Sequence, residues 1–423
     1  MDNRYDKYKD SGIAWIGEIP EHWTIIDLKY LSDIRGRIGF KGYTVSDLVS
    51  EGEGAFVIGG KHINQCVLNL EYPDYISWDK YYESPEIMVS KGDIVMAQRG
   101  TLGKVAIIEY DINEATINPS LVLIKNIKCQ GKFLYYYLNS ESTLTLISIL
   151  NTATAVPMIS QNQIENMPIP IPSSIEQQSI ATYLDQKCSK IDELITLQEE
   201  MITKLQSYKQ SVITEAVTKG LDKNVPLKDS GIEWIGEIPE HWTLKRIKNI
   251  CDNLDYLREP ISAEHRSRNN PIYDYYGASG VIDKIDYYNV DDEVLLIGED
   301  GANLVMRNLP LVYKVKGKFW VNNHAHILKP KNDNYDFCAY AFEAADYSLF
   351  ITGSAQPKLS QENLGRIKIA IPSLSEQQSI ADYLDQKCSE IDELISIKQQ
   401  KIEKLKDYKK SLIFECVTGK RKV

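Results

Sequence analysis

The sequence predicts a mixed α/β protein in which two globular domains are joined by two long helices that form an antiparallel coiled coil. Three observations support this fold class: two long blocks of sequence occur twice, one repeated block has heptad spacing, and β-rich runs fill the segments between the blocks. We therefore expect an internal repeat with pseudo-two-fold symmetry. The expected parts are a first globular domain at residues 1–172, a first helix at 173–219, a second globular domain at 220–371 and a second helix at 372–423.

The repeat is nearly exact in two blocks. Residues 9–24 return as residues 228–243 with only Ala14 replaced, and residues 176–195 return as residues 376–395 with changes only at Thr182 and Lys190. The segments between these blocks differ in length and largely in sequence. Two similar frames with different inserts indicate two modules of different specificity, because a duplicated enzyme would be expected to keep its active-site insert more alike than its frame.

Both inserts contain β-rich runs bounded by Gly, Asp or Asn, as expected for short strands. In the first insert these runs are residues 92–100, 104–110 and 117–125, and in the second they are residues 292–301, 309–315 and 318–329. The inserts also close alike, because residues 151–161 match residues 351–361. We therefore interpret the inserts as divergent copies of one fold.

The second repeated block predicts a long helix in each half. Ser173 with Glu176, and Ser373 with Glu376, have the Ser-x-x-Glu spacing of a capping box, and Gly220 and Gly419 stand where each helix should end. About 44 residues at about 1.5 Å each give a length of roughly 65 Å. The seam residues of the first helix are Leu184, Ile191, Leu205 and Val212, interrupted by Gln198, with Leu194, Met201 and Tyr208 as companions; those of the second are Leu384, Ile391, Leu405 and Leu412, interrupted by Lys398, with Leu394, Lys401 and Tyr408.

The two helices are expected to pair with each other, since a heptad seam of this length is too apolar to leave in water. A pseudo-two-fold through the middle of the pair makes them antiparallel. The alternative is that each helix packs on its own globular domain as an ordinary amphipathic helix. The repeated tryptophans, Trp15 with Trp234 and Trp23 with Trp242, are interpreted first as a core patch between insert and helix, and second as a partner surface.

Composition limits the class of protein. The seven cysteines form no Cys-x-x-Cys pair, which favours neither a disulfide framework nor a zinc ribbon. No apolar stretch approaches the roughly 18 residues that span a bilayer, and the first residues are polar, so we expect a cytoplasmic protein without a membrane partner. The net charge of −11 argues against a naked nucleic-acid binder, unless favourable charge is confined to one face or partner subunits supply phosphate contacts.

The block DSGIEWIGEIPEHW, the block IPSxxEQQxIAxYLDxK and their double occurrence around two variable inserts resemble the specificity subunit of a type I restriction-modification enzyme. The resemblance covers essentially the whole chain. It implies that each insert is a target-recognition domain that reads one half of a bipartite sequence in double-stranded DNA. It also implies that the helices dock methyltransferase (modification) subunits, two in number, and it leaves open whether restriction and translocase subunits accompany this chain.

Two domains mounted on a stiff rod engage one face of B-DNA when their half-sites lie near a whole number of turns apart, about 10 base pairs per turn. The pseudo-two-fold turns one domain over, so the two domains should address opposite strands. Because the inserts differ, we expect an asymmetric target in two parts, with an unread gap between them.

Catalytic signatures are missing from the sequence. It has no Asn/Asp-Pro-Pro-aromatic motif, no glycine-rich S-adenosylmethionine turn and no Walker A loop, so we expect a non-catalytic subunit without a cofactor. His324 and His326 share strand spacing, but without an obvious third ligand they are interpreted as hydrogen-bonding residues, and no metal is expected. The alternatives are a self-contained methyltransferase or nuclease with duplicated domains, and a coiled-coil scaffold that binds only proteins.

The candidate DNA-binding residues are polar and aromatic side chains in the Gly-rich loops. Asn and Gln pair with adenine through two hydrogen bonds, and Arg or Lys reach guanine or phosphate. Each residue alone is also compatible with a turn or solvent role. The candidates are Lys61, His62, Arg99, Thr101, Lys104, Thr152, Thr154 and Gln161 in the first insert, and Tyr276, Ser279, Asn303, Asn322, Asn323, His324, Ser354, Gln356 and Lys358 in the second.

Overall fold

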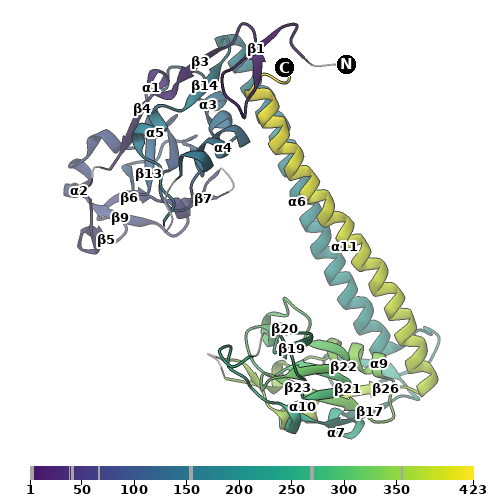
Figure 1. Cartoon of the computed structure of the whole chain (residues 1–423). Helices are drawn as coiled ribbons and strands as arrows, with labels where there is room; N and C mark the ends of the chain where they lie inside the picture. The colour runs from purple at the N-terminus through teal and green to yellow at the C-terminus, as the bar shows by residue number, and fades with distance from the viewer. Residues whose placement is uncertain are drawn as a thin grey trace. The chain divides into compact units, whose positions relative to one another are not determined.

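The computed structural model describes residues 4–37, 39, 42–64, 67–151, 156–266, 271–353 and 356–423. The chain divides into two compact units, which we call unit 1 (residues 1–198 and 400–423) and unit 2 (residues 199–399). Each unit is mixed α/β and contains parts of both long helices, so this coarse fold prediction is confirmed (Figure 1). No helix in the described part of the chain is long and apolar enough to cross a lipid bilayer.

Unit 1 is built on two four-stranded sheets. One has the strand order β11-β10-β13-β4 and the other β12-β6-β9-β5, while β1 pairs with β2, β3 with β14, and β7 with β8. Its strands are β1 Tyr8–Asp10, β2 Glu18–Pro20, β3 Thr24–Asp27, β4 Asp33–Gly36, β5 Leu48–Val49, β6 Gly54–Ile58, β7 Ile63–Asn64, β8 Val67–Leu68, β9 Asp74–Ser77, β10 Ile94–Ala97, β11 Val105–Ile107, β12 Ala115–Ile117, β13 Leu121–Lys125 and β14 Pro168–Ile171. Its short helices are α1 Leu28–Leu31, α2 Trp78–Tyr82, α3 Gly131–Leu138, α4 Glu141–Leu150 and α5 Gln161–Glu165.

Unit 2 is built on one six-stranded sheet with the order β18-β23-β21-β22-β19-β20, with β15 pairing with β16, β17 with β26, and β24 with β25. Its strands are β15 Leu227–Asp229, β16 Glu237–Pro239, β17 Thr243–Arg246, β18 Cys251–Asn253, β19 Tyr273–Gly277, β20 Gly280–Ile285, β21 Val290–Gly298, β22 Val312–Val321, β23 Ala325–Pro330, β24 Ile351–Thr352, β25 Lys358–Leu359 and β26 Lys368–Ile371. Its short helices are α7 Ile247–Ile250, α8 Asn303–Met306, α9 Tyr335–Ala344 and α10 Gln361–Arg366.

The strands of the two units pair in matching registers. In unit 1, β3 and β14 pair with Asp27 opposite Pro168, and in unit 2, β17 and β26 pair with Arg246 opposite Lys368. The antiparallel pair β10 and β13 corresponds to β21 and β23, and the parallel pair β6 and β12 corresponds to β19 and β22. Pairing therefore assigns equivalent positions in the two units even where their sequences differ.

The two long helices are α6 Ser174–Lys219 and α11 Leu374–Val417. Both begin with the predicted capping box, since Ser173 and Glu176, like Ser373 and Glu376, exchange hydrogen bonds between side chain and main chain. Serine and glutamate thereby satisfy backbone N–H groups that have no partner inside the helix.

Each unit contains one segment of α6 packed against one segment of α11. In unit 1, Asp192 accepts hydrogen bonds from Lys409 at 2.7 Å, and Leu184 and Leu412 share one hydrophobic core. In unit 2, Asp392 accepts hydrogen bonds from Lys209 at 2.7 Å. The core of unit 2 likewise includes Val212 and Leu384. The primary seam residues Leu184, Ile191, Val212, Leu384, Ile391 and Leu412 are buried, whereas Leu205 and Leu405 are half-buried.

The predicted companion seam was wrong. Leu194 and Tyr208 of α6 are 43% and 56% exposed, and Leu394 and Tyr408 of α11 are also exposed. The buried side chains next to the primary seam lie one residue later than predicted, as at Cys188 and Ile402. Leu194 is followed by Ile195 and Met201 by Ile202, so the apolar pattern alone fits either register.

The tryptophan blocks belong to the cores where the helices end. Trp23 packs with Val417 in the core of unit 1, and Trp242 packs with Val217 in the core of unit 2. Both tryptophans are fully buried, which supports the core interpretation over a partner surface for these two side chains. Gly419 has a positive φ, and a Cβ there would lie 2.2 Å from Pro20, so glycine allows the end of α11 to approach this core.

Candidate nucleic-acid interface

Four loop segments meet at one end of the strands in unit 1. We call residues 59–62, 98–104, 118–120 and 156–159 the unit 1 loop cluster. Main-chain hydrogen bonds join them: the N–H of Asn118 donates to Ile58 at 2.9 Å, that of Gln98 to Ser120 at 2.9 Å, and that of Ile159 to Gln98 at 2.9 Å. The cluster is therefore positioned by backbone contacts that do not depend on its side chains.

Unit 2 holds the corresponding segments in the same way. Its loop cluster comprises residues 277–280, 299–307, 322–324 and 356–359. The N–H of Asn322 donates to Tyr276 at 3.1 Å, that of Glu299 to His324 at 2.8 Å, and that of Leu359 to Glu299 at 2.7 Å. These three hydrogen bonds match the three in unit 1 position by position.

An asparagine begins the middle loop in both clusters. The side-chain oxygen of Asn118 accepts the N–H of Ser120 at 3.0 Å, and that of Asn322 accepts the N–H of His324 at 2.8 Å. Such asparagine turns fix a short loop locally, without support from the next strand. Asn322 is buried, so its side chain acts here on its own loop.

Glycines allow the neighbouring turn to approach these loops. A Cβ on Gly59 would lie 2.8 Å from the side chain of Asn118, and a Cβ on Gly298 would lie 2.7 Å from the carbonyl oxygen of Ala278. Both separations are below normal van der Waals contact. The glycines therefore allow close packing of the loops in each cluster.

The unit 1 loop cluster presents mostly neutral or basic side chains. Gln98 donates hydrogen bonds to the carbonyls of Pro119 and Leu121, whereas Arg99 and Thr101 are exposed. Lys61 forms an ion pair of 2.7 Å with Asp74, and Lys104 donates to Gly60 at 3.5 Å. Within the described residues, Arg99 has no carboxylate partner, so its guanidinium is available to a ligand.

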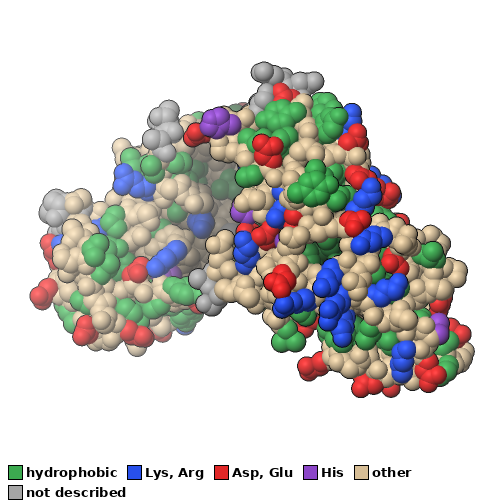
Figure 2. Space-filling model, turned by 90° about the horizontal axis from the view of Figure 1, so that it is seen from below, with side chains coloured by type: hydrophobic (Ala, Val, Ile, Leu, Met, Phe, Trp, Pro, Cys, Tyr) green, Lys and Arg blue, Asp and Glu red, His purple; other side chains and the backbone are tan. Residues whose placement is uncertain are grey.

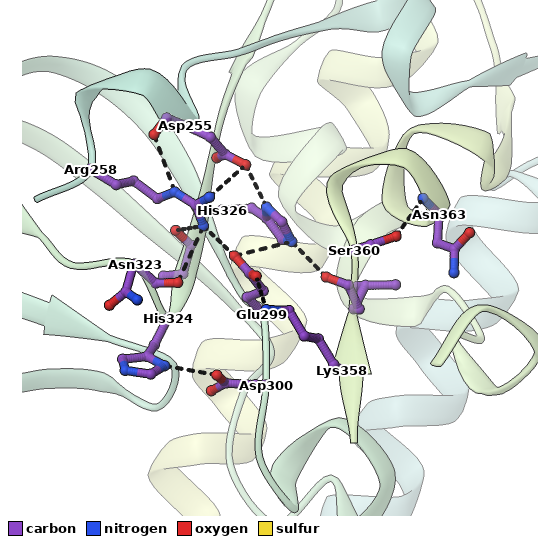
Figure 3. Close-up of polar contacts among 12 residues, drawn as sticks. Asp255, Arg258, Glu299, Asp300, Asn323, His324, His326, Lys358, Ser360 and Asn363 are labelled. Carbon is purple, nitrogen blue, oxygen red and sulfur yellow. Dashed lines mark hydrogen bonds and ion pairs between the residues drawn. The ribbon is translucent and has the colours of Figure 1, made fainter. Parts of the chain in front are cut away.

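The unit 2 loop cluster stands on a buried network of charged side chains (Figure 3). Glu299 forms ion pairs with Arg258 and, at 2.9 Å, with Lys358. Asp255 lies 3.4 Å from Arg258 and accepts the N–H of Ile327 at 2.8 Å. Burial raises the pKa of Glu299, but the hydrogen bonds from Arg258 and Lys358 outweigh it and lower the pKa overall. The network therefore holds a charged carboxylate directly beneath the loops.

His326 connects this network to the segment before α10. Nδ1 of the ring lies 2.6 Å from a carboxylate oxygen of Asp255 and Nε2 lies 2.8 Å from the carbonyl oxygen of Leu359, and the side chain is 1% exposed. His324, two residues earlier, is exposed and lies 2.7 Å from Asp300 (Figure 3). Both histidines thus have hydrogen-bonding partners, and no group of three or more His, Cys, Asp or Glu in the described part of the chain could hold a metal ion.

The family is decided by comparison with known proteins. The family model described as "Type I restriction modification DNA specificity domain" matches residues 68–206 and 239–407. The chain belongs to this family.

Relatives match along nearly the whole length of this specificity subunit. The type I restriction enzyme MjaVIII specificity subunit of Methanocaldococcus jannaschii is 25% identical over 446 residues, which cover 96% of this chain and 94% of that protein. The sequence-based assignment to type I specificity subunits is thereby confirmed. As a member of this family, the chain contributes DNA sequence specificity and is not itself a catalytic subunit.

Solved structures show the same fold. A chain from a structural study of complex assembly and conformational transition in the type I restriction-modification system has a TM-score of 0.71 at 14% identity, covering 95% of this chain and 99% of that chain. The crystal structure of the HsdS subunit from Thermoanaerobacter tengcongensis has a TM-score of 0.50 at 15% identity, covering 95% and 98%.

The structure places most of the predicted DNA-binding residues of this specificity subunit in the two loop clusters. Among them, Asn323, His324, Gln356 and Lys358 are exposed in unit 2, as are Lys61, Arg99 and Thr101 in unit 1, where Lys104 is half-buried. Thr152, Thr154 and Ser354 lie outside the described residues. Ser279 is an exposed residue of the unit 2 cluster, in the turn beside Gly298.

Four other candidates have side chains that are occupied by contacts within the protein. His62 is buried, accepting the N–H of Gly59 at 2.9 Å, and Asn303 exchanges hydrogen bonds with the main chain of Leu309. Gln161 lies against Gly36 of β4, and Tyr276 packs edge-on against Phe319. A base contact by His62 would require its turn to open.

Sequence reasoning missed the residues beneath the loops. Gln98, Ser120, Asp255 and Arg258 were not among the candidates. Gln98, Ser120 and Arg258 each hydrogen-bond to a residue of their loop cluster, and Asp255 contacts Arg258 and His326. Gln98 could have been found, because it stands beside Arg99 in the run that aligns with the GEDG of the second insert. Asp255 and Arg258 lie in a part of the second insert for which the sequence has no matching run in the first.

Proposed function

We propose that this specificity subunit reads an asymmetric DNA target in two parts, with one half-site contacted by each loop cluster. The observation that carries this proposal is that the two clusters share their main-chain hydrogen bonds but present different side chains at matched positions. A common main-chain arrangement would place each cluster against DNA in the same way. The different side chains would then select different bases.

The exposed candidates supply the chemistry for direct readout. In unit 1, Arg99 has the donor groups that suit guanine in the major groove, and Lys61, Thr101 and Lys104 belong to the same cluster. In unit 2, Asn323 and Gln356 offer the amide pattern that suits adenine. Ser279, His324 and Lys358 of unit 2, together with Thr152, Thr154 and Ser354, complete the proposed set of contacts, while His62, Gln161, Tyr276, Asn303 and Asn322 would act by holding the loops.

We further propose that α6 and α11 form one antiparallel coiled coil, with residues 1–172 and 220–371 as the two target-recognition domains and pseudo-two-fold symmetry between the halves. The pairs Asp192 with Lys409 in unit 1 and Asp392 with Lys209 in unit 2 support this arrangement, because they occupy repeated positions of the two helices. Such a coiled coil would fix the spacing between half-sites.

Methyltransferase subunits are the partners that we propose for the helices. Leu194 and Leu197 are both 43% exposed in unit 1, and the equivalent Leu394 and Ile397 are 47% and 53% exposed in unit 2. Apolar side chains left exposed in pairs mark protein contact sites. Two equivalent pairs would dock two methyltransferase subunits, and any restriction or translocase subunit that accompanies this chain would join the complex through them.

The test is to express the chain with its methyltransferase subunit in a host that lacks other adenine methylation, and to map methylated adenines across the genome. We expect one asymmetric motif in two parts separated by an unspecified gap of constant length. A continuous motif, or a palindromic one, would contradict the proposal. Methylation by the chain alone would instead favour a self-contained enzyme.

A further inference from the structure

A second feature of unit 2 lies outside its loop cluster. The side chains around α7, α10 and the β17–β26 pair enclose a cleft of about 870 Å³. Five basic residues line it: Arg246, Lys248, Lys331, Arg366 and Lys368. Lysine and arginine side chains also gather on the face of unit 2 that carries α7 and α10 (Figure 2). We call this feature the basic cleft.

The charge of the basic cleft is only partly compensated. Lys331 pairs with Asp252 at 3.2 Å, and Arg366 pairs with Glu362, the two acidic residues in the lining. Within the described part of the chain, no carboxylate lies within ion-pair distance of Arg246, Lys248 or Lys368. In a chain of net charge −11, an exposed cleft that concentrates unpaired cations favours a polyanionic ligand.

Unit 1 has the same backbone at this place with less basic charge. Strand pairing sets Asp27 opposite Pro168 where unit 2 has Arg246 opposite Lys368. Lys29, the counterpart of Lys248, lies 3.2 Å from Asp27 and donates to Asn166. The fold therefore does not require a basic surface here, and the basic cleft belongs to unit 2 alone.

Main-chain hydrogen bonds identify Lys128 of unit 1 as the counterpart of Lys331. The N–H of Lys331 donates to Ile250 at 2.9 Å, and the N–H of Lys128 donates to Leu31 at 2.8 Å. Asn166 takes the place of Arg366, as the matching closing segments of the inserts indicate. Of the five basic residues, only Lys248 and Lys331 thus have a basic counterpart in unit 1, and these counterparts are Lys29 and Lys128.

The position of the basic cleft favours DNA over an acidic protein. Asn253 and Gln361 are among the residues that line the cleft. Each is separated by one residue from a partner of His326 in the network beneath the loop cluster, Asp255 and Leu359. The cleft therefore continues from the surface proposed to read bases, where a duplex would present its phosphates next.

We propose that the basic cleft binds the sugar-phosphate backbone of duplex DNA next to the half-site read by unit 2, whatever its base sequence, and that unit 1 makes no equivalent contact. The proposal rests on the function proposed above. The basic cleft would add affinity for DNA and would hold the duplex against the unit 2 loop cluster. The contacts would carry no sequence information, because phosphates are alike at every base pair.

The test compares salt dependence of binding. The full chain, assembled with its methyltransferase subunit, is titrated with a duplex that carries the mapped target, between about 50 and 200 mM salt. The logarithm of the binding constant falls linearly with the logarithm of the salt concentration. The triple variant R246Q/K248Q/K368Q is expected to make this fall less steep by about 2 to 3, since each lost phosphate contact removes about 0.9 from the steepness. Its affinity should fall roughly tenfold or more near physiological salt, while the methylated motif stays the same.

Unit 1 supplies the matched controls. The variant K29Q/K128Q should leave the slope unchanged. The variant D27R/N166R should make the slope steeper by about 1 to 2, because it places cations at the positions of Arg246 and Arg366. The single variant K368Q, with an expected loss of about 0.9, serves if the triple variant does not fold. Urea denaturation checks that each variant is folded.

An unchanged slope in the folded triple or single variant would overturn the proposal. If assembly of the methyltransferase subunit is weakened at the same time, the cleft would be assigned to binding an acidic protein surface. Failure of the proposed function has a different signature, since it would show in the mapped motif of the unaltered chain.

Discussion

The two loop clusters differ in charge while their main chains match. Gln98 and Arg99 in unit 1 stand where Glu299 and Asp300 stand in unit 2, and Met158 stands where Lys358 stands. The hydrogen bonds that position these loops come from backbone groups, so side chains can be exchanged with little change in the loop path. A fixed main chain with exchangeable side chains would allow a recognition domain to change its target sequence while it keeps its fold.

The difference also has a structural cost in unit 2. Gln98 is neutral and satisfies two carbonyl groups, whereas Glu299 brings a charge beneath the loops and requires Arg258 and Lys358 as partners. Asp255 and His326 complete that network. Unit 2 should therefore be more sensitive to single substitutions at this place than unit 1.

Removal of Arg258 should have the largest effect. Arg258→Met removes the guanidinium from Asp255 and leaves Lys358 as the only ion-pair partner of Glu299 in the network described above. Breaking a buried ion pair of this kind costs about 3 to 5 kcal/mol of the free energy of unfolding. Urea denaturation followed by circular dichroism measures the loss. In unit 1, Gln98→Leu removes neutral hydrogen bonds and should cost about 1 kcal/mol. Equal losses in the two variants would mean that the charged network adds nothing to unit 2.

Substitution of Arg99 should change recognition without changing stability. Arg99→Ala removes an exposed guanidinium and is expected to cost about 1 to 3 kcal/mol of binding at one base pair of the first half-site. Methylation mapping should then show a relaxed preference at that base pair and an unchanged second half-site. The matched variant Met158→Ala in the same cluster should leave both half-sites unchanged. An unaltered motif and affinity for Arg99→Ala would remove this residue from the proposed contacts.

Gly298 tests how closely the loops approach. Gly298→Ala would place its Cβ 2.7 Å from the carbonyl oxygen of Ala278, and we expect a loss of about 1.5 kcal/mol in the free energy of unfolding from overpacking. Unit 1 carries Ala97 at the same place, opposite Leu121 as Gly298 is opposite Ala325. Ala97→Gly should cost less, about 0.5 to 1 kcal/mol. Calorimetric melting of both variants compares them, and a neutral Gly298→Ala would show that the unit 2 loops have room to move.

The smallest effect concerns the helix starts. Burial raises the pKa of Glu376, but hydrogen bonds from His241, Ser373 and Trp242 lower it from the ordinary 4.5 to about 2. Its contribution to stability is therefore present above about pH 4.5 and is lost as the pH falls toward 2. Because the carboxylate is partly exposed, we expect roughly 1 kcal/mol.

Glu376→Gln should thus destabilise the protein at pH 7 and match the unaltered protein near pH 2, as measured by urea denaturation across this range. Glu176→Gln is the control in unit 1, where the pKa of Glu176 is also lowered but the indole of Trp23 has no hydrogen-bond partner among the described residues. A difference between Glu376→Gln and the unaltered protein that persists at pH 2 would assign the effect to packing rather than charge.

Much of the fold could be predicted from the sequence because it rests on local signals. The capping boxes at Ser173 and Ser373 fixed both helix starts, and the primary seam was found because Leu184 and Ile191 recur at heptad spacing. The companion seam was misassigned where adjacent apolar residues, such as Leu194 and Ile195, make two registers equally apolar. Only the packing of the partner helix distinguishes them.

The candidate site was predictable in its loops and not in its supports. Gly-rich turns led to the segments around Arg99 and Lys358, and isolated bridges join Arg99 to Met158 and Asp300 to Lys358 in the folded units. The partners Asp255 and His326 lie far apart in sequence and have no spacing pattern of their own. Their hydrogen bond depends on strand β23 lying beside the turn that carries Asp255, which is a property of the folded sheet.

The division of the chain between the units also sets an order of completion during synthesis. Unit 2 is one continuous stretch of residues, whereas the core of unit 1 takes Leu412, Ile413 and Val417 from the last turns of α11. Unit 1 is thus the first to leave the ribosome and the last to acquire its full core. A chain that stops before these residues would have a complete core in unit 2 and an incomplete core in unit 1. Chaperones and proteases could therefore distinguish it from a full-length chain.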